Sequence, residues 1–413
     1  MIHSADTGSR LFQAYAKTRH APVVMQVLPA LNSGGVEQGV IDINAAIVKA
    51  GGHSIVVSNG GARVHEITRG GGMHLELPVH SKNPFVMIAT IHRLRKMIRE
   101  MNVDIVHACS RAPAWVALKA VEGTGARFMT SCHAAHGVSN NLKRLYNTVM
   151  GKGERVIAVS AFIADYLQEH LNASPDVIRV VHRGVAIERF HPNAVSPERL
   201  IRLSQEYRIP EGASVIMLPA RLTRIKGHML LLDAIQRLKR RDVFCLFVGS
   251  DAGNESYRAE LEADIAAKDM GGMVRIVPNC RDMPAAYMLA TVVTCPSIVP
   301  EGFGRVPIEA QAMGRPIVAT DHGGARETIL RDDTGWLVPP GDAAALAAAL
   351  SDALSLTDRE RALLATRAMG HVADHFTNNG MCDGTLDVYA ELLNAGAPAL
   401  SAPEDAAQGR LAA

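Results

Sequence analysis

Short apolar segments alternate with helical segments over most of the 413 residues, and this alternation is the strongest constraint on the fold. After the connector Phe190-His-Pro192 the alternation starts again. Apolar strands separated by helices are typical of parallel sheets that are covered on both faces. We therefore predict an α/β protein with two Rossmann-like domains in tandem and a ligand at the carboxyl ends of the strands. The strand-like segments are VVMQVL, HSIVVS, GMHLELPV, VDIVHAC, RFMTSC and RVIAVS before the connector, and SVIMLP, FCLFV, VRIV, VVTC, PIVAT and WLV after it.

The composition agrees with this fold class. The chain is long enough for two domains with separate cores. A hydrophobic content of 48% with 4% aromatic residues suits an Ala/Val/Leu-rich α/β protein. The formal net charge is +2, but residues 1–192 hold 21 Lys and Arg against 13 Asp and Glu, and the remainder holds 22 against 28. We expect the basic half alone to meet an anionic surface or substrate, and no nucleic-acid partner.

The six cysteines are scattered, with no C-x-x-C spacing and no cluster of Cys and His at metal-ligand spacing. This pattern predicts buried, reduced thiols in a cytoplasmic chain, with no bound metal and no other cofactor. The N-terminal segment lacks the apolar region of a signal peptide. No stretch approaches the roughly 20 apolar residues that span a membrane, so any membrane contact is expected to be peripheral.

Two carboxylates eight positions apart, Glu301 and Glu309, flank the sequence GFGRVPI. A strand-like segment precedes them, and Pro307 suits the first turn of a helix. Glu301 is thereby predicted on a loop at a strand's carboxyl end, with the amides of Gly302, Phe303 and Gly304 at a helix N-terminus. Carboxylates accept sugar hydroxyls, and such amides favour oxygen-rich ligands. A bare pair at this spacing is more often two solvated acids, so the surrounding sequence decides.

These residues, with GRPIVA from Gly314, Gly323-Gly324 and GWLVPP from Gly335, resemble the nucleotide-sugar signature of retaining GT-B glycosyltransferases of family 4. In that family the first Glu lies beside the donor sugar, the second holds the ribose, and the amides between them bind sugar hydroxyls. The resemblance implies these roles for Glu301, for Glu309 and for Gly302, Phe303 and Gly304. It also implies the GT-B fold, with the two sheets facing each other across a cleft.

The expected domain boundaries combine this resemblance with the connector. We expect a flexible N-terminus over 1–20, an acceptor domain over 21–190 and a nucleotide-sugar domain over 191–378. A C-terminal helix over 379–395 is expected to pack back on the first domain, as in the family. The Ala/Pro/Gly-rich tail over 396–413 is expected to be disordered.

Arg221 and Lys226 lie five positions apart between a strand-like and a helical segment. Two cations there can neutralise a diphosphate leaving group, although isolated pairs at this spacing are usually exposed surface residues. The pair matches the family's R-x4-K-G diphosphate clamp, so we assign both to donor binding and catalysis. The chain has no D-x-D triplet, so a metal-bridged diphosphate is not expected.

Gly34 and Gly35 join the first strand to the first helix, where they let the backbone approach phosphate oxygens. A plain tight turn would use the same residues. The family directs this loop at the donor diphosphate. Ser110 and Arg111 begin the loop that we expect to contact the acceptor.

Two histidines, His107 and His133, lie at predicted strand ends. His133 matches the position where the family places a histidine near the donor sugar and the reacting carbon, so we assign it a catalytic role. His107 is expected to be structural. No Asp or Glu near His133 offers a covalent nucleophile of the glycosidase kind. The resemblance implies front-face return, in which the leaving phosphate takes the proton of the acceptor.

The segment over 85–99 combines an apolar face with a basic one. Such a helix either covers a sheet or docks on an anionic bilayer, and further basic residues over 142–155 favour the bilayer. Segments such as SRAPAW and TSCHAAHG are similar to lipopolysaccharide-core glycosyltransferases of bacteria, which implies a glycolipid or lipopolysaccharide acceptor. Two alternatives stay open: a nucleotide-sugar epimerase on the same scaffold, and a non-catalytic protein that binds nucleotide sugars.

Overall fold

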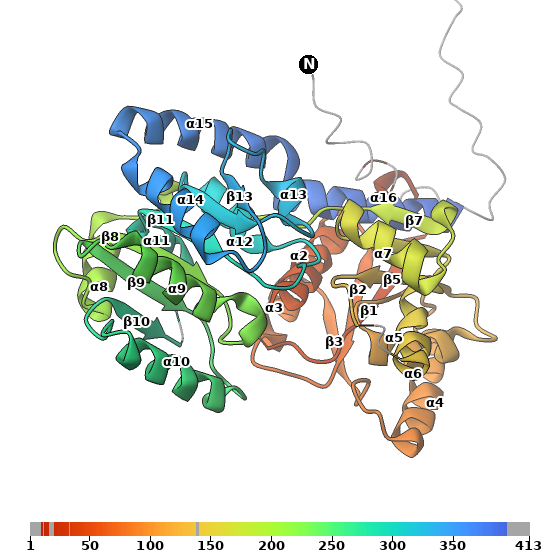
Figure 1. The fold of residues 1–413 in the computed structure, drawn as a ribbon. Helices are drawn as coiled ribbons and strands as arrows, with labels where there is room; N and C mark the ends of the chain where they lie inside the picture. Colours follow the sequence, from red (N-terminus) through yellow and green to blue (C-terminus); the bar gives the residue numbers. More distant parts are fainter. Residues whose placement is uncertain are drawn as a thin grey trace, which may run out of the picture. The chain divides into compact units, whose positions relative to one another are not determined.

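The computed structural model describes residues 10, 12–15, 20–32, 34–137, 140–278 and 280–394 (Figure 1). Contacts divide these residues into two compact units. Unit 1 holds the described residues up to Thr130, Lys152–Val156 and those from Asp383 onward. Unit 2 holds Ser131–Gly151 and Ile157–Cys382.

The first sheet has seven strands in the order β3-β2-β1-β4-β5-β6-β7. Within it, β1 pairs in parallel with β2 on one side and with β4 on the other. The strands are β1 (Val23–Val27), β2 (His53–Ser58), β3 (Met73–Glu76), β4 (Ile105–Ala108), β5 (Arg127–Cys132), β6 (Arg155–Ala158) and β7 (Ile178–Val180). The helices along this part of the chain are α2 (Gly35–Lys49), α3 (Val64–Arg69), α4 (Pro84–Glu100), α5 (Arg111–Val121), α6 (Asn141–Asn147), η1 (Thr148–Gly151), α7 (Ala161–Leu171) and η2 (Pro175–Val177).

The second sheet has six strands in the order β10-β9-β8-β11-β12-β13. Here β8 pairs in parallel with β9 and with β11. The strands are β8 (Ser214–Pro219), β9 (Val243–Val248), β10 (Val274–Val277), β11 (Val292–Cys295), β12 (Ile317–Thr320) and β13 (Trp336–Val338). The helices are η3 (Pro192–Ala194), α8 (Pro197–Tyr207), η4 (Arg224–Lys226), α9 (His228–Leu238), α10 (Glu255–Ala267), α11 (Met283–Leu289), α12 (Arg305–Ala312), α13 (Ala325–Thr328), α14 (Ala343–Ser355), α15 (Asp358–His375) and α16 (Asn378–Asn394).

The inner strands of both sheets are buried because most of their side chains are apolar on both faces. All six residues of β9 are buried, and all four of β4. Helices α9 and α14 pack on each other, and Leu232 and Leu350 from these helices join Phe247 of β9 in one core. Continuous apolar strands are what a parallel sheet with covered faces requires. The prediction of two parallel Rossmann-like α/β sheets is confirmed.

The strand order reverses direction at one place in each sheet. In the first sheet this place lies between β1 and β4, and in the second between β8 and β11. Loops that leave two such strands run in opposite directions, which opens a crevice at the carboxyl ends of those strands. The fold therefore points to the loops after β1 and β4, and to those after β8 and β11, as places for a ligand.

Several expectations lie wholly or partly outside the described residues. The tail over 396–413 is not described, and of residues 1–20 the structure describes Arg10, 12–15 and His20. The predicted domain boundaries stay predictions. Strand β7 was missing from the prediction, because it is three residues long and contains Arg179. Within the described part of the chain, no helix combines the length and the apolarity that crossing a membrane requires.

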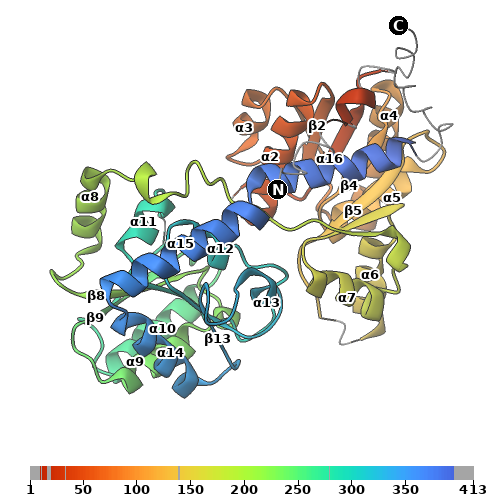
Figure 2. The same ribbon diagram turned by 90° about the horizontal axis from the view of Figure 1, so that it is seen from above.

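Helix α16 contributes to the core of unit 1 through Tyr389, which is fully buried. Figure 2 shows α16 passing beside β4. There the Tyr389 hydroxyl lies 2.7 Å from Nδ1 of His107, and the two rings meet edge to face. Burial lowers the pKa of His107 to about 3, so the folded protein keeps this imidazole neutral. These contacts give His107 the structural role that was expected of it.

We predict that this histidine makes the fold sensitive to acid. In the unfolded chain His107 takes up a proton near pH 6.5, whereas in the folded chain it does so near pH 3. Stability is therefore fully present above pH 6.5 and falls on acidification, by about 1.4 kcal/mol per pH unit from this group. Denaturant unfolding at pH 7, 6 and 5 measures the slope. His107→Gln should make the slope shallower, while His92→Gln, at an exposed position, serves as the control. Equal slopes for wild type and His107→Gln would contradict the prediction.

Candidate functional site

Lys226 and Glu301 flank the reversal point of the second sheet. Lys226 ends η4, which follows β8, and Glu301 lies on the loop after β11. The Lys226 Nζ lies 2.8 Å from Oε1 of Glu301, and the side chains are 20% and 24% exposed. The structure therefore brings these two predicted site residues together inside unit 2.

The backbone fixes this pairing. Gly227 has a φ of +77°, and a Cβ added there would lie 1.9 Å from the carbonyl oxygen of Pro296. The amide of Ile298 donates to the carbonyl of Ile225 at 2.9 Å. The turn that carries Lys226 is thus held against the loop that carries Glu301, and a side chain at position 227 would push them apart.

The two oxygens of the Glu301 carboxylate differ in their surroundings. Besides Lys226, Oε1 accepts hydrogen bonds from the Ser297 hydroxyl and, at 3.4 Å, from the Cys295 thiol. Among the described residues none donates to Oε2. Burial by itself would raise the pKa of Glu301, but the charge of Lys226 and these hydrogen bonds lower it below the ordinary value. Glu301 is therefore ionised at neutral pH.

The loop after Glu301 lies against two further segments of unit 2. A Cβ added to Gly302 would lie 2.3 Å from the carbonyl oxygen of His133. The Ser160 hydroxyl donates to the Gly302 carbonyl at 2.5 Å. Phe303 is buried, and its ring lies 5.7 Å from that of Phe376. His133, directly after β5, is thereby a neighbour of the loop that is predicted to bind the sugar.

Gly304 and Glu309 belong to the start of α12. Gly304 has a φ of +79° and is the N-cap of this helix. Glu309 is 12% exposed, and Arg305 Nη2 lies 2.9 Å from its Oε1. The Tyr287 hydroxyl donates to its Oε2 at 2.8 Å. Burial raises the pKa of Tyr287 well above the ordinary value, as does the Glu309 charge, so this hydroxyl stays a donor.

Arg221 is exposed in the turn after β8. Its side chain forms no hydrogen bond or ion pair with the residues that the structure describes, Lys226 and Glu301 included. Sequence reasoning missed three residues that hold the acids, namely Ser297, Tyr287 and Arg305. A serine two residues beyond a strand end, and an arginine one turn before a glutamate, were the available signals.

In unit 1 the predicted residues flank the other reversal point. Gly34 is the N-cap of α2, which follows β1, and Gly35 begins that helix. Ser110 is the N-cap of α5, which follows β4, and Arg111 begins it. Because the carboxyl ends of parallel strands meet at one edge, the two helix starts share that edge of the sheet.

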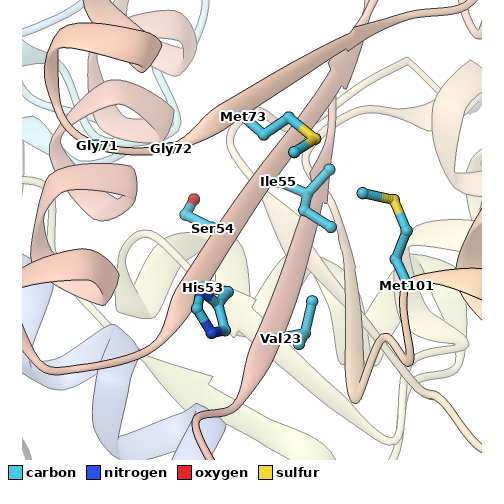
Figure 3. A pocket seen from close by; sticks show the side chains of 8 residues that line it. All are labelled: Val23, His53, Ser54, Ile55, Gly71, Gly72, Met73 and Met101. Atoms are coloured by element: carbon cyan, nitrogen blue, oxygen red, sulfur yellow. The ribbon is translucent and has the colours of Figure 1, made fainter.

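A cavity of about 430 Å³ lies at the opposite edge of this sheet (Figure 3). Val23, His53 and Met73, the first residues of β1, β2 and β3, line it, together with Ser54, Ile55, Gly71, Gly72 and Met101. Figure 3 shows apolar side chains, among them Ile55 and Met101, around it. It contains none of the predicted site residues, so we assign it no part in the chemistry.

Groups that could hold a metal ion are absent from the described part of the chain, where no three His, Cys, Asp or Glu side chains cluster suitably. The site does contain cationic side chains and helix-start amides. The described residues that supply such groups are Lys226, Arg305 and the amides before α12.

Two family models and several known proteins identify the class to which the chain belongs. Residues 33–189 match the family described as Glycosyltransferase Family 4, and residues 201–368 match that described as Glycosyl transferases group 1. A glycosyltransferase from Rickettsia africae ESF-5, known as a crystal structure, is 36% identical, with a TM-score of 0.84 over 91% of this chain and 99% of that one.

Two further proteins are more distant. The crystal structure of Anabaena Alr3699/HepE in complex with UDP-glucose shares the fold, with a TM-score of 0.77 at 20% identity over 91% of this chain and 99% of that one. The D-inositol 3-phosphate glycosyltransferase of Saccharomonospora viridis is 31% identical over 256 residues, which are 60% of this chain and 58% of that protein. The chain thus spans well under two thirds of this relative's length.

The likeness to the Rickettsia protein covers nearly the whole of both chains, and the two family matches fall on the two sheets in turn. The chain therefore belongs to the glycosyltransferases, with a first half of family 4 and a second half of group 1.

Proposed function

We propose that the protein is a retaining glycosyltransferase that moves a sugar from a nucleotide-sugar donor to a lipid-linked or lipopolysaccharide-core acceptor. The contact between Lys226 and Glu301 carries the proposal. It lies where a parallel sheet of this order binds ligands, and it offers a cation and an ionised acid side by side. A sugar diphosphate needs both, because its phosphates are anionic and its ring carries hydroxyls.

In this proposal Lys226 and Arg221 neutralise the diphosphate, and Gly34 and Gly35 present amides to it. Glu301 accepts hydroxyls of the donor sugar, and the amides of the Gly302–Gly304 loop help to bind them. Glu309 accepts the ribose hydroxyls. Each oxygen of Glu309 receives one described donor, and a carboxylate oxygen can accept a second.

The proposed reaction keeps the anomeric configuration without a covalent enzyme intermediate. The bond between the anomeric carbon and the phosphate oxygen breaks, and the acceptor oxygen bonds to the same carbon on the same face. The acceptor proton passes to the leaving phosphate. Glu301 is assigned to the sugar hydroxyls rather than to nucleophilic attack on the anomeric carbon. His133 is assigned to positioning the reacting groups, and no metal takes part.

The lipid acceptor is supported by exposed apolar residues beside basic ones. On α4, Phe85 is 83% exposed and Ile88 is 55% exposed, whereas Leu94 and Ile98 are buried. On α6, exposed Leu142 and Leu145 stand beside Lys143 and Arg144. Such surfaces suit contact with an anionic bilayer. Ser110 and Arg111 are proposed to bind the polar part of the acceptor, on the cytoplasmic side of the membrane.

A second candidate acceptor is a soluble inositol phosphate. The name of the Saccharomonospora relative favours it, and the donor chemistry would be the same. The basic first half of the chain suits an anionic acceptor of either kind.

Incubation with a panel of nucleotide sugars tests the proposal. Lipid extracts, lipopolysaccharide cores and inositol phosphates are supplied as acceptors, in excess EDTA. We expect transfer to a glycolipid, with the chelator without effect, because cationic side chains neutralise the diphosphate. Transfer to inositol phosphate would select the second acceptor.

Two other outcomes would contradict the proposal. Activity that depends on added Mg²⁺ or Mn²⁺ would contradict the neutralisation of the diphosphate by Lys226 and Arg221. Epimerisation of the donor, or binding without transfer, would contradict the proposed reaction.

We predict that Lys226→Ala and Arg221→Ala each reduce turnover strongly while the fold stays intact. Both cations face a diphosphate that gains negative charge in the transition state, so each should contribute about 2–4 kcal/mol. Steady-state kinetics with the donor found by the panel measures the loss. Arg224→Ala is the matched control, because Arg224 lies on the same turn but pairs with Glu260. Wild-type rates in both site variants, or an equal loss of rate in Arg224→Ala, would contradict the assignment of Lys226 and Arg221 to the diphosphate.

We predict that substitution of Glu301 and substitution of Glu309 change different kinetic and binding constants. Glu309→Gln should weaken binding of the donor and of the free nucleoside diphosphate alike, because it removes charge-assisted acceptance at the ribose. Glu301→Gln should lower kcat more than it raises the donor KM, because charge builds on the sugar ring in the transition state.

Calorimetric titration of the free nucleoside diphosphate into both variants decides between these roles. Glu301→Gln should keep near wild-type affinity and Glu309→Gln should lose it. The opposite result would exchange the two roles and refute the proposed placement of the donor.

A further inference from the structure

Ser297 is buried, with 2% of its surface exposed, and its hydroxyl donates to Oε1 of Glu301. Serine hydroxyls rotate freely unless their partners fix them. The Cys295 thiol reaches the same oxygen at 3.4 Å, but a thiol is a weak donor. Ser297 is therefore the strong neutral donor to this carboxylate among the described residues.

A second layer fixes Ser297 itself. Its carbonyl oxygen accepts a hydrogen bond of 2.8 Å from the Thr320 hydroxyl, at the end of β12. His322 Nε2 lies 2.8 Å from the same oxygen, and since a carbonyl only accepts, this nitrogen carries the proton. The backbone of Glu301 is held from the same side, where the Gly324 amide donates to its carbonyl at 3.0 Å.

These contacts fall on one side of the carboxylate. Oε1 receives Lys226, Ser297 and Cys295, whereas Oε2 lies toward Gly304, 3.9 Å from where a Cβ on that glycine would stand. Gly304 belongs to the loop assigned to the sugar. A half-turn of the carboxylate about its last bond only exchanges its two equivalent oxygens, but any partial rotation would break the Ser297 hydrogen bond.

We propose that Ser297 is a positioning residue that fixes the plane of the Glu301 carboxylate, so that one oxygen (Oε1) is turned into the protein and the other (Oε2) faces the donor sugar. The inference rests on the proposed function, and adds to it the group that orients the carboxylate. Lys226 alone does not suffice for this, because an ammonium group interacts with either oxygen as a point charge. A hydroxyl whose own backbone is anchored at two points has a fixed direction, so it also sets the orientation of the carboxylate plane.

The titratable groups around this contact are Lys226 on η4, Cys295 at the end of β11 and His322 after β12. Removal of the Ser297 hydroxyl takes a hydrogen bond from the charged form of Glu301, so the pKa of Glu301 should rise. Because His322 also contacts Ser297, the carboxyl group of Glu301 has to be followed directly.

The experiment compares Ser297→Ala, Ser297→Thr and the exposed control Ser355→Ala with wild type. Carbon-13 NMR of glutamate carboxyl groups, with Glu301→Gln to assign the signal, gives the pKa of Glu301 without any substrate. Kinetics with the donor found by the panel gives kcat and KM. Thermal unfolding confirms that each variant is folded.

For Ser297→Ala we expect a raised Glu301 pKa, an acid limb of kcat at higher pH and a fall in kcat of about tenfold, the scale of one lost hydrogen bond to a charged group. The donor KM should change by less than about twofold. Ser297→Thr keeps the hydroxyl and should restore most of kcat. Cys295→Ala should have a smaller effect than Ser297→Ala, since it removes the weaker donor.

An unmoved Glu301 pKa and kcat in Ser297→Ala would overturn the positioning role alone. Equal losses in folded Ser297→Ala and Ser297→Thr would also overturn it, because size rather than the hydroxyl would then matter. Wild-type protein that transfers no sugar from any donor would overturn the proposed function, while a raised pKa in Ser297→Ala would still establish the contact.

Discussion

The pair of Lys226 and Glu301 is the interaction on which the candidate site depends. Partial burial of a carboxylate is costly, and a single opposite charge often fails to offset that cost. Here the cation is held by the contact of Gly227 with Pro296, and a buried serine adds a hydrogen bond to the charged form. The net contribution of such a pair to folding is small, so we interpret it as a device that fixes geometry rather than one that stabilises the protein. The position of the pair then matters more than its energy, and topology sets that position.

Both sheets reverse their strand order beside their first strand, and this repeated topology explains where the predicted residues lie. Gly35 and Arg111 begin the helices that follow β1 and β4, while Lys226 and Glu301 follow β8 and β11. Because all strands of a parallel sheet run in the same direction, their carboxyl ends lie along one edge of the sheet. Residues that follow these strands therefore come close together although they are far apart in the sequence. The cavity of Figure 3 lies at the opposite edge of the first sheet, at the amino ends of the strands. None of the predicted site residues lines it.

Much of this could be predicted from the sequence, because it depends on local patterns. Apolar runs identify buried parallel strands, and a glycine-rich turn before Pro307 identifies the start of α12. The partners of the acids could not be found in this way. Tyr287 lies on α11 and contacts Glu309 on α12. Ser297 and Glu301 lie on the same loop after β11, whose fold brings their side chains together. Both contacts depend on side-chain directions that only the packed structure defines. β7 was missed for the opposite reason, since a three-residue edge strand leaves almost no periodic signal.

The two glutamates look equivalent in the sequence, but their surroundings separate them. Glu309 has a described donor on each oxygen, from Arg305 and Tyr287, and is 12% exposed. Glu301 has its described donors on one oxygen and leaves the other toward the loop of Gly304. A carboxylate held from both sides suits a part of the ligand that does not change during the reaction. One that keeps an oxygen open suits a group whose charge grows, because that oxygen can strengthen its interaction as the charge develops. The asymmetry of the hydrogen bonds therefore supports giving the sugar to Glu301 and the ribose to Glu309, on grounds independent of the sequence motif.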